Sequence, residues 1–288
     1  MEFETTTSSS RTGLTADPQG PSRRVIIWDA TIRLEVLEPL AGAAGALRIR
    51  TTYEKSLATV RSDTFDPLAA AAQEQYASLQ GKSVEFGLDG DGSVVSISGL
   101  EGLVQDAQAL ETAGKWISQV TSGPGAPATG VVAGQKWSST QPASLPIGGL
   151  SWRTESEYLR DEPCRAPVPA PDSAGAEPVV PFGNSPGGDE CAVVLTRMDL
   201  VRGKSADDST PDDYRKNGLR TSGKWNGSGQ SLSYISLRTG MLVGMTQTGN
   251  EQMDFTLTSD TNQTLRYVGA ISSRLQVSLT ADPVEPHP

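Results

Sequence analysis

The segment at residues 81–100, GKSVEFGLDGDGSVVSISGL, indicates a β-hairpin that leads into a helix. Apolar side chains alternate with polar or small ones on both sides of a central turn, at Val84, Phe86, Leu88, Val95 and Ile97. The turn at residues 89–92, Asp-Gly-Asp-Gly, offers the positive φ angles that a tight reversal needs. Ser98 and Glu101 then have the spacing of a capping box, which predicts the start of a helix.

Two longer segments with the same period of two precede this hairpin. In the first, the apolar positions on one face are Ile26, Trp28, Ala30, Ile32, Leu34 and Val36. The second continues the pattern with Leu47, Ile49, Thr51, Tyr53, Leu57 and Val60. Alternation of this kind is typical of an antiparallel sheet that buries one face and exposes the other.

Helix signals flank the hairpin, and short strands fill the end of the chain. Asp66 and Pro67 suit the start of a helix that ends at Gly81, and residues 100–120 keep helical spacing. After residue 190 the pattern predicts strands at 192–202, 219–225, 230–237, 241–248, 253–258, 262–270 and 274–279, with a turn at residues 249–251. We therefore expect an α+β, mainly β fold: a large curved antiparallel sheet, or half-barrel, with two helices packed over it.

The domain organisation follows from the loops. We expect a single domain over residues 1–288, because no linker separates two independent parts. Three irregular segments stand out: a Pro/Gly-rich insertion at 162–190, an acidic loop at 203–217 that we expect to be solvated, and a flexible tail at 281–288.

Charge and hydropathy exclude several partners. The net charge of −10 argues against nucleic acid, whose affinity comes from neutralised phosphates, and against anionic membrane surfaces. No run approaches the roughly 18 apolar residues of a membrane helix, so we expect no membrane span. The chain begins with Met1-Glu2-Phe3 as if in the middle of a strand, which suggests that an export signal lies upstream.

Cys164 and Cys191 are the two cysteines, and they bracket the Pro-rich insertion between two expected strands. A disulfide between them would close a loop of about 27 residues and stabilise the fold by roughly 3 kcal/mol. The alternative is two unrelated thiols. Neither cysteine has the spacing of a metal site.

Catalytic groups are scarce. The single histidine is His287, in the tail, which argues against a Ser-His-Asp or Cys-His nucleophile. The Asp89–Gly92 turn lacks the Gly and the Glu that a calcium-binding EF-hand needs at its sixth and twelfth positions, Val94 and Leu100. Glu155 and Glu157 share one strand face, and solvated charge explains them as well as acid–base work does. We expect no enzyme activity, no cofactor and no metal.

The order of these features resembles a group of bacterial secreted or lipid-anchored β-rich proteins. They carry a segment of the type LxGKxVxFxLDxxGxVxxVxGL, which corresponds to residues 79–100 here. It is followed by a Gly-x-x-Trp step at residues 134–137 and a Thr-Gly turn at residues 239–240. In shape, the expected fold is similar to the curved half-barrels of LolA- and LppX-type envelope lipid carriers. The resemblance implies a periplasmic, lipid-anchored or extracellular location and an apolar ligand.

Three hypotheses for the function follow. The first is a non-enzymatic envelope or secreted protein that binds an apolar or amphipathic ligand. Its candidate lining residues, each of which also suits a plain core, are Trp28, Ile32, Val84, Phe86, Leu103 and Leu110. The second is a structural or adhesive surface subunit that self-assembles or binds an envelope protein partner. The third, a glycan hydrolase, would need two carboxylates facing each other across a cleft.

Overall fold

The computed structural model contains two compact units. The first comprises Met1–Arg11 and Thr15–Gly130, and the second comprises Thr12–Leu14 and Val131–Pro288. The structure describes residues 2–13, 22–38, 47–64, 69–88, 94–103, 127, 130–143, 145–164, 189–203, 210–238 and 240–279. These residues are mainly β, and the strands within each unit pair antiparallel, which confirms the expected fold class. The single domain over residues 1–288 stays a prediction.

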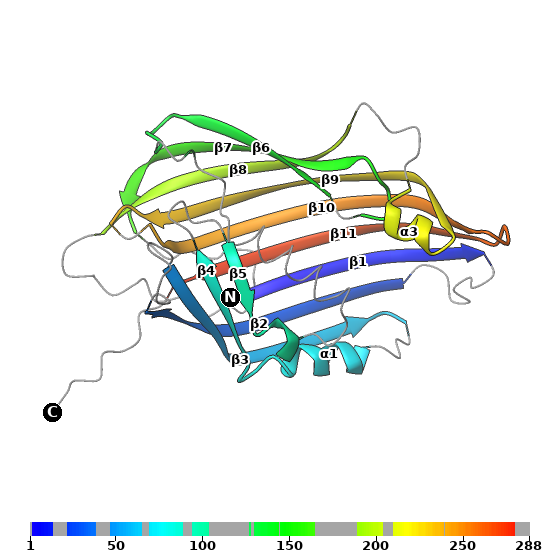
Figure 1. Cartoon of the computed structure of the whole chain (residues 1–288), viewed down its shortest axis with the longest axis horizontal. Coiled ribbons are helices and arrows are strands. Elements are labelled where there is room, and N and C mark those ends of the chain that lie inside the picture. The colour runs from blue at the N-terminus through cyan, green and yellow to red at the C-terminus, as the bar shows by residue number, and fades with distance from the viewer. Residues whose placement is uncertain are drawn as a thin grey trace. The chain divides into compact units, whose positions relative to one another are not determined.

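In its described part, the first unit is a sheet with one α-helix (Figure 1). Its elements are β1 (Glu2–Gly13), β2 (Ser22–Leu37), β3 (Leu47–Ser62), α1 (Ala69–Ala77), β4 (Ser83–Leu88), β5 (Val94–Ser98) and the 3₁₀ turn η1 (Leu100–Gly102). The strand order is β5-β4-β3-β2-β1. The expected hairpin is confirmed by the β4–β5 pairing, whereas its turn and the first residues of the expected helix at 65–68 lie outside the described part of the chain.

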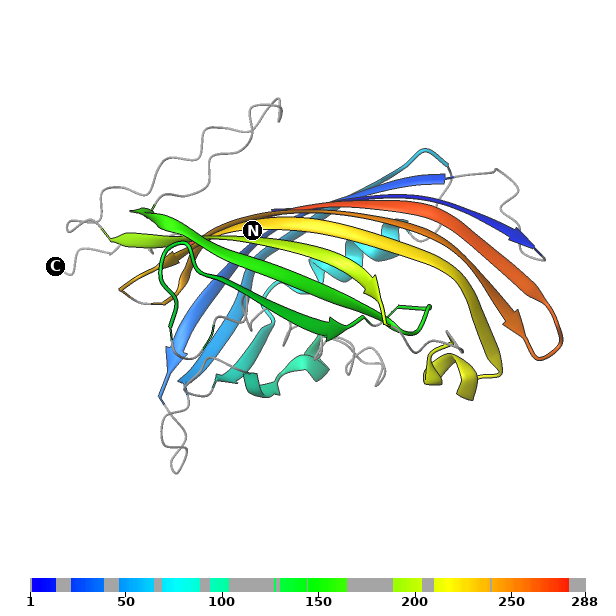
Figure 2. The same cartoon turned by 90° about the horizontal axis from the view of Figure 1, so that it is seen from above.

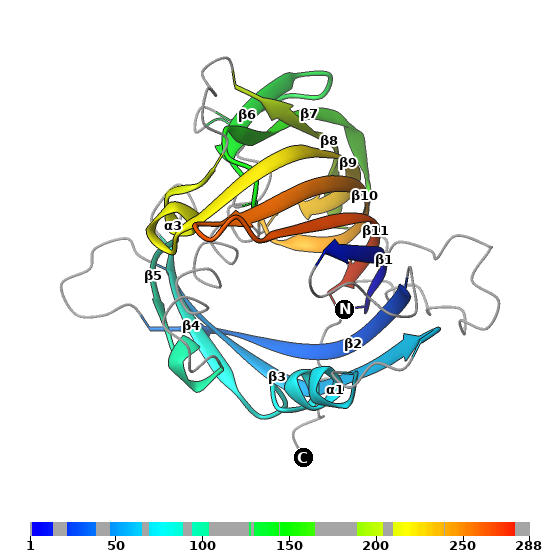
Figure 3. The ribbon, with the colours of Figure 1, turned by 90° about the vertical axis from the view of Figure 1, so that its right-hand side faces the viewer.

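One face of this sheet carries the helix. Trp28 pairs with Ala58 and Ala30 pairs with Ser56, so these residues share one face of β2 and β3. An irregularity after Thr31 shifts the register, and Ile32 therefore pairs with Tyr53 on that same face. Figure 3 shows α1 lying along β3. We call this side of the sheet the helix face.

In the second unit, the described strands form a sheet with the order β11-β10-β9-β8-β7-β6. Its elements are β6 (Lys136–Pro142), β7 (Leu150–Pro163), β8 (Glu190–Arg202), α3 (Asp212–Lys216), β9 (Leu219–Ser236), β10 (Leu242–Ser259) and β11 (Thr264–Ser278). Figure 2 shows the yellow to red strands β9, β10 and β11 bending along their length, as the right-handed twist of long strands requires.

The expectation of many short strands at the end of the chain is wrong. The pairs of segments at 219–237, 241–258 and 262–279 are three continuous strands, β9, β10 and β11. Gly249 and Asn250, expected in a turn, lie in the middle of β10, where Gly249 pairs with Gly229. Glycine was therefore a misleading turn signal at this position, because paired strands on both sides hold the backbone extended.

Two further local predictions need correction. The turn η1 has Gly99 as its N-cap, with a φ of 88° and no side-chain cap, so the capping box of Ser98 and Glu101 does not form. The residues after Leu103 in the second expected helix lie outside the described chain. Within the acidic loop, Asp212–Lys216 form the short helix α3, with two acids in its first turn and two basic residues in its last, which complements the helix dipole.

Candidate functional site

One end of the helix face is a closed core beneath α1. The Trp28 ring lies 5.4 Å from the Tyr76 ring on α1 and 6.2 Å from the Tyr53 ring on β3. The Trp28 indole donates a hydrogen bond of 2.9 Å to the Ser56 hydroxyl, which donates one of 2.7 Å to the Tyr76 carbonyl. Burial raises the pKa of both tyrosines. This chain of contacts fixes α1 to the sheet.

A second small core lies at β4. Val84 and Phe86 are buried with Leu100, and Ile97 and Leu103 pack against them. The alternation read from the sequence therefore directs Val84 and Phe86 to the same side, and η1 covers them.

Beyond these cores the helix face carries exposed apolar side chains. Leu34 is 46% exposed, Val36 is 66% exposed and Leu47 is 41% exposed. Val36 pairs with Ile49, which lies two residues from Leu47 on the same face. We call Leu34, Val36, Leu47 and Ile49 the apolar strip. It continues the face of Trp28 and Ile32 along the same strands.

The opposite face of the first unit is a network of charges. Glu85 accepts hydrogen bonds of 2.8 Å from Arg48 and 2.7 Å from Arg50. The bonds from Arg50 and then Arg48 lower the pKa of Glu85, and the bond to Glu85 raises the pKa of Arg50. Arg33 lies 2.9 Å from Glu54 on this face. The two faces thus differ sharply in polarity, and only the helix face offers apolar side chains of the strip to an apolar ligand.

The six predicted lining residues separate into groups. Val84, Phe86 and Leu103 belong to one cluster, while Trp28 lies in the core beneath α1. Ile32 is half-buried on the same face, and Leu110 lies outside the described residues. That these side chains line a ligand stays a prediction.

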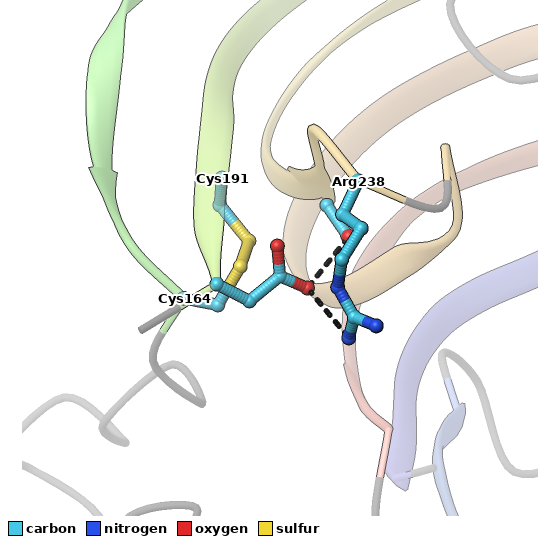
Figure 4. The surroundings of a disulfide bond; sticks show 5 residues. Cys164, Cys191 and Arg238 are labelled. Atoms are coloured by element: carbon cyan, nitrogen blue, oxygen red, sulfur yellow. Dashed lines mark hydrogen bonds and ion pairs between the residues drawn. A yellow bond between two sulfur atoms is a disulfide. The ribbon is translucent and has the colours of Figure 1, made fainter. Parts of the chain in front are cut away.

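The predicted disulfide is confirmed, and polar contacts surround it (Figure 4). Cys164 and Cys191 have Cα atoms 4.9 Å apart, and Cys191 is fully buried. Next to them, the Asp189 carboxylate accepts a 2.8 Å hydrogen bond from the Ser236 hydroxyl and lies 3.5 Å from the Arg238 guanidinium. The disulfide and this acid therefore tie the ends of β7 and β8 to β9.

The second unit also has two unlike faces. The charged residues of its central strands lie mostly on one side, which we call the charged face: Glu155, Glu157, Arg197, Asp199, Arg220, Lys224, Asp254, Arg266 and Arg274. On this face Arg266 forms two hydrogen bonds with Asp254, which lower the pKa of the acid. The other side, the aromatic face, carries Trp137, Trp152, Trp225, Phe255 and Tyr267.

Three rings form a row across neighbouring strands of the aromatic face. The Trp225 and Phe255 centroids are 5.6 Å apart, and the Phe255 and Tyr267 centroids are 5.0 Å apart, both stacked. Ile147, in the loop before β7, and Leu150, the first residue of β7, are buried together with Phe255. The row is thus anchored at Phe255, and its outer rings remain half-buried.

A carboxylate lies beside this row. Glu251 accepts a 2.7 Å hydrogen bond from the Trp225 indole and pairs in register with Gly227. A Cβ at position 227 would lie 2.6 Å from Cη2 of Trp152 and 3.3 Å from Cγ of Glu251. Two indoles and an acid therefore converge at one glycine. The sequence analysis missed this group, although Glu251 stands in phase with Met253, Phe255 and Leu257.

The carboxylates of the described residues bear on the question of a metal site. Among the residues that the structure describes, no group of three or more His, Cys, Asp or Glu side chains could hold a metal ion. Glu155 lies 3.6 Å from Arg153 and Glu157 lies 3.3 Å from Lys136, so cations neighbour both acids of β7. The Asp-Gly-Asp-Gly turn lies outside the described chain. No helix among the described residues is long and apolar enough to cross a membrane.

Comparison with known proteins gives no relative: no protein-family model matches the chain, and no curated protein matches it.

Proposed function

We propose that the protein is a non-enzymatic, exported binding protein that takes up an apolar or amphipathic ligand on the helix face of its first unit. The apolar strip carries this proposal. Leu34, Val36 and Leu47 are exposed together on a face that α1 covers at Ser56. The core that η1 covers lies beside the strip, because Phe86 is the register partner of Ile49. Grouped apolar side chains at a surface are typical of ligand or partner sites, whereas single ones need no explanation.

The charge distribution supports an amphipathic ligand. The face opposite the strip carries Arg48 and Arg50, which both pair with Glu85 and keep that side polar. A ligand tail would replace water over the strip and leave a polar head at its edge. The Cys164–Cys191 disulfide supports a location outside the cytoplasm, since such bonds persist in oxidising compartments.

The test is binding of a fluorescent long-chain fatty acid to the whole chain and to two matched variants. Val36→Asp places a charge in the strip. Leu57→Asp is the control, because Leu57 is 53% exposed and pairs with Asp29 on the opposite face of the same sheet. Covering a valine side chain contributes about 1.5 kcal/mol or more, so we expect Val36→Asp to weaken binding about tenfold or more. Equal effects of the two variants, or no saturable binding, would refute the proposal.

A surface subunit that assembles through its sheet edge is the second candidate. β6 ends the strand order of the second unit and pairs only with β7 among the described strands, which leaves one side for strand addition. Sedimentation velocity of the purified chain tests this reading. A stable dimer or larger assembly at micromolar concentration would favour it over the carrier.

A further inference from the structure

Glu251 is out of place in the charge pattern of the second unit. Within β9, β10 and β11, which the structure describes throughout, it is the only charged side chain on the aromatic face. One of its carboxylate oxygens accepts the bond from Trp225, and no described residue provides a cation for it. Glu251 is half-buried, and burial penalises a charge that no cation among the described residues balances.

The groups around Glu251 are those that recognise an organic cation. An edge of the Trp152 ring lies over Gly227, and Glu251 is the register partner of this glycine on β10. Trp225 lies two residues before Gly227 on β9 and donates its indole hydrogen to Glu251. Indole faces attract ammonium groups through their quadrupole, and a carboxylate adds a full negative charge. A bare metal ion would need several oxygen ligands, and this group offers one carboxylate. We propose that Trp152, Trp225 and Glu251 form a binding site for an organic ammonium group.

The site is held in place before any ligand arrives. Trp225 stacks on Phe255, which is buried, and donates its indole hydrogen to Glu251. Trp152 lies so close to Gly227 that no larger residue fits there without displacing the ring. Rings fixed in this way lose little conformational freedom on binding.

The residues beside the site indicate which kind of ammonium group it would bind. Gly229 and Gly249 pair beside the site, and a Cβ at position 229 would lie 3.1 Å from the Cε methyl of Met198. Glycine within a strand allows close approach of a ligand to the backbone, and a thioether is a soft apolar neighbour. An ammonium group with methyl substituents therefore suits the site better than a strongly hydrated one.

The test compares choline with its neutral isostere 3,3-dimethylbutan-1-ol on the whole chain. Binding is followed through the indole N–H NMR signals of Trp152 and Trp225. We expect saturable shifts with choline and about tenfold weaker binding of the neutral compound, since a cation–π contact with a carboxylate beside it supplies that difference. Equal binding of the two compounds, or no saturable shift with choline, would overturn the proposal.

Two variants separate the charge from the fold. Glu251→Gln keeps an acceptor for the Trp225 indole and removes the charge, and we expect it to weaken choline binding about tenfold. Glu157→Gln is the control, because Glu157 lies on the charged face and should leave choline binding unchanged. Unchanged binding in Glu251→Gln would refute the role of the acid. Fatty-acid binding at the apolar strip should survive Glu251→Gln, so this site and the proposed function fail independently.

Discussion

The most direct test of the first unit is the hydroxyl of Ser56. This side chain is fully buried, with an exposed fraction of 0%, and it links the Trp28 indole on β2 to the Tyr76 carbonyl on α1. Ser56→Ala leaves the indole N–H buried without an acceptor. The Tyr76 carbonyl keeps a second donor, the amide of Leu79 at 3.1 Å, and suffers less.

The magnitude follows from these two groups. An unsatisfied buried donor costs about 1–3 kcal/mol, and the partly satisfied carbonyl adds little, so we expect Ser56→Ala to lower the free energy of unfolding by about 2 kcal/mol. Urea unfolding followed by far-UV circular dichroism measures the loss. Ser98→Ala on β5 is the control, because Ser98 is exposed and should change stability by less than about 0.5 kcal/mol.

A double-mutant cycle isolates the hydrogen bond. Trp28→Phe removes the donor and keeps an aromatic ring in the core. If the bond matters as argued, Ser56→Ala should cost clearly less in the Trp28→Phe background than in the natural chain. An equal cost in both backgrounds would show that Ser56 acts through packing alone, and the reasoning about α1 would fail.

Three further predictions concern stability. Removal of the disulfide in Cys164→Ser/Cys191→Ser, which opens a loop with a sequence separation of 27, should lower the free energy of unfolding by about 3 kcal/mol in urea titrations. The arginine partners of Glu85 lower its pKa in the folded protein. The stability that this acid contributes is therefore present above its unfolded pKa of about 4.3, and it is lost as the pH falls through the lower folded pKa. We expect the free energy of unfolding of Glu85→Gln to depend less on pH in that acid range. Burial, and next the hydrogen bond to Asp161, raise the pKa of Tyr158 to about 12. The stability that this phenol contributes is therefore present below its unfolded pKa of about 10 and is lost as the pH rises through 12. Ultraviolet titration should show one phenol ionising late, and Tyr158→Phe should remove it.

The elements predicted well from the sequence are those with a strong local pattern. β2 and β3 follow the period of two around Trp28 and Tyr53, and the β4–β5 hairpin follows from Val84 and Phe86. The disulfide was predictable because its cysteines flank an insertion between two strands. For these strands the signal lies within a few residues of the element that it describes.

The predictions that failed depend on contacts between segments that are far apart in the sequence. Leu34 and Val36 have the same pattern as Trp28 and Ala30, yet they are exposed, whereas Trp28 packs against Tyr76 of α1. The local sequence states which face is apolar and does not state how far the cover extends. The apolar strip, on which the proposed function rests, was therefore invisible before the pairing of β2 with β3 and the position of α1 were known.

The glycines of β9 and β10 carry the same lesson further. Gly227 and Gly249 weaken the local preference for a strand. Residues 249–251 were therefore expected to form a turn, and Gly227 fell in the gap between two expected strands. In the sheet, the missing side chain at position 227 is replaced by the Trp152 ring, which comes from β7, and Met198 similarly approaches Gly229. Long-range contacts thus supply what the local sequence lacks, and an aromatic ring over a strand glycine is a known means of compensation. Gly227 interrupts the strand pattern in the sequence, and the same residue allows Trp152 to approach Glu251 in the structure. The strand prediction therefore failed at the place where the proposed cation site forms.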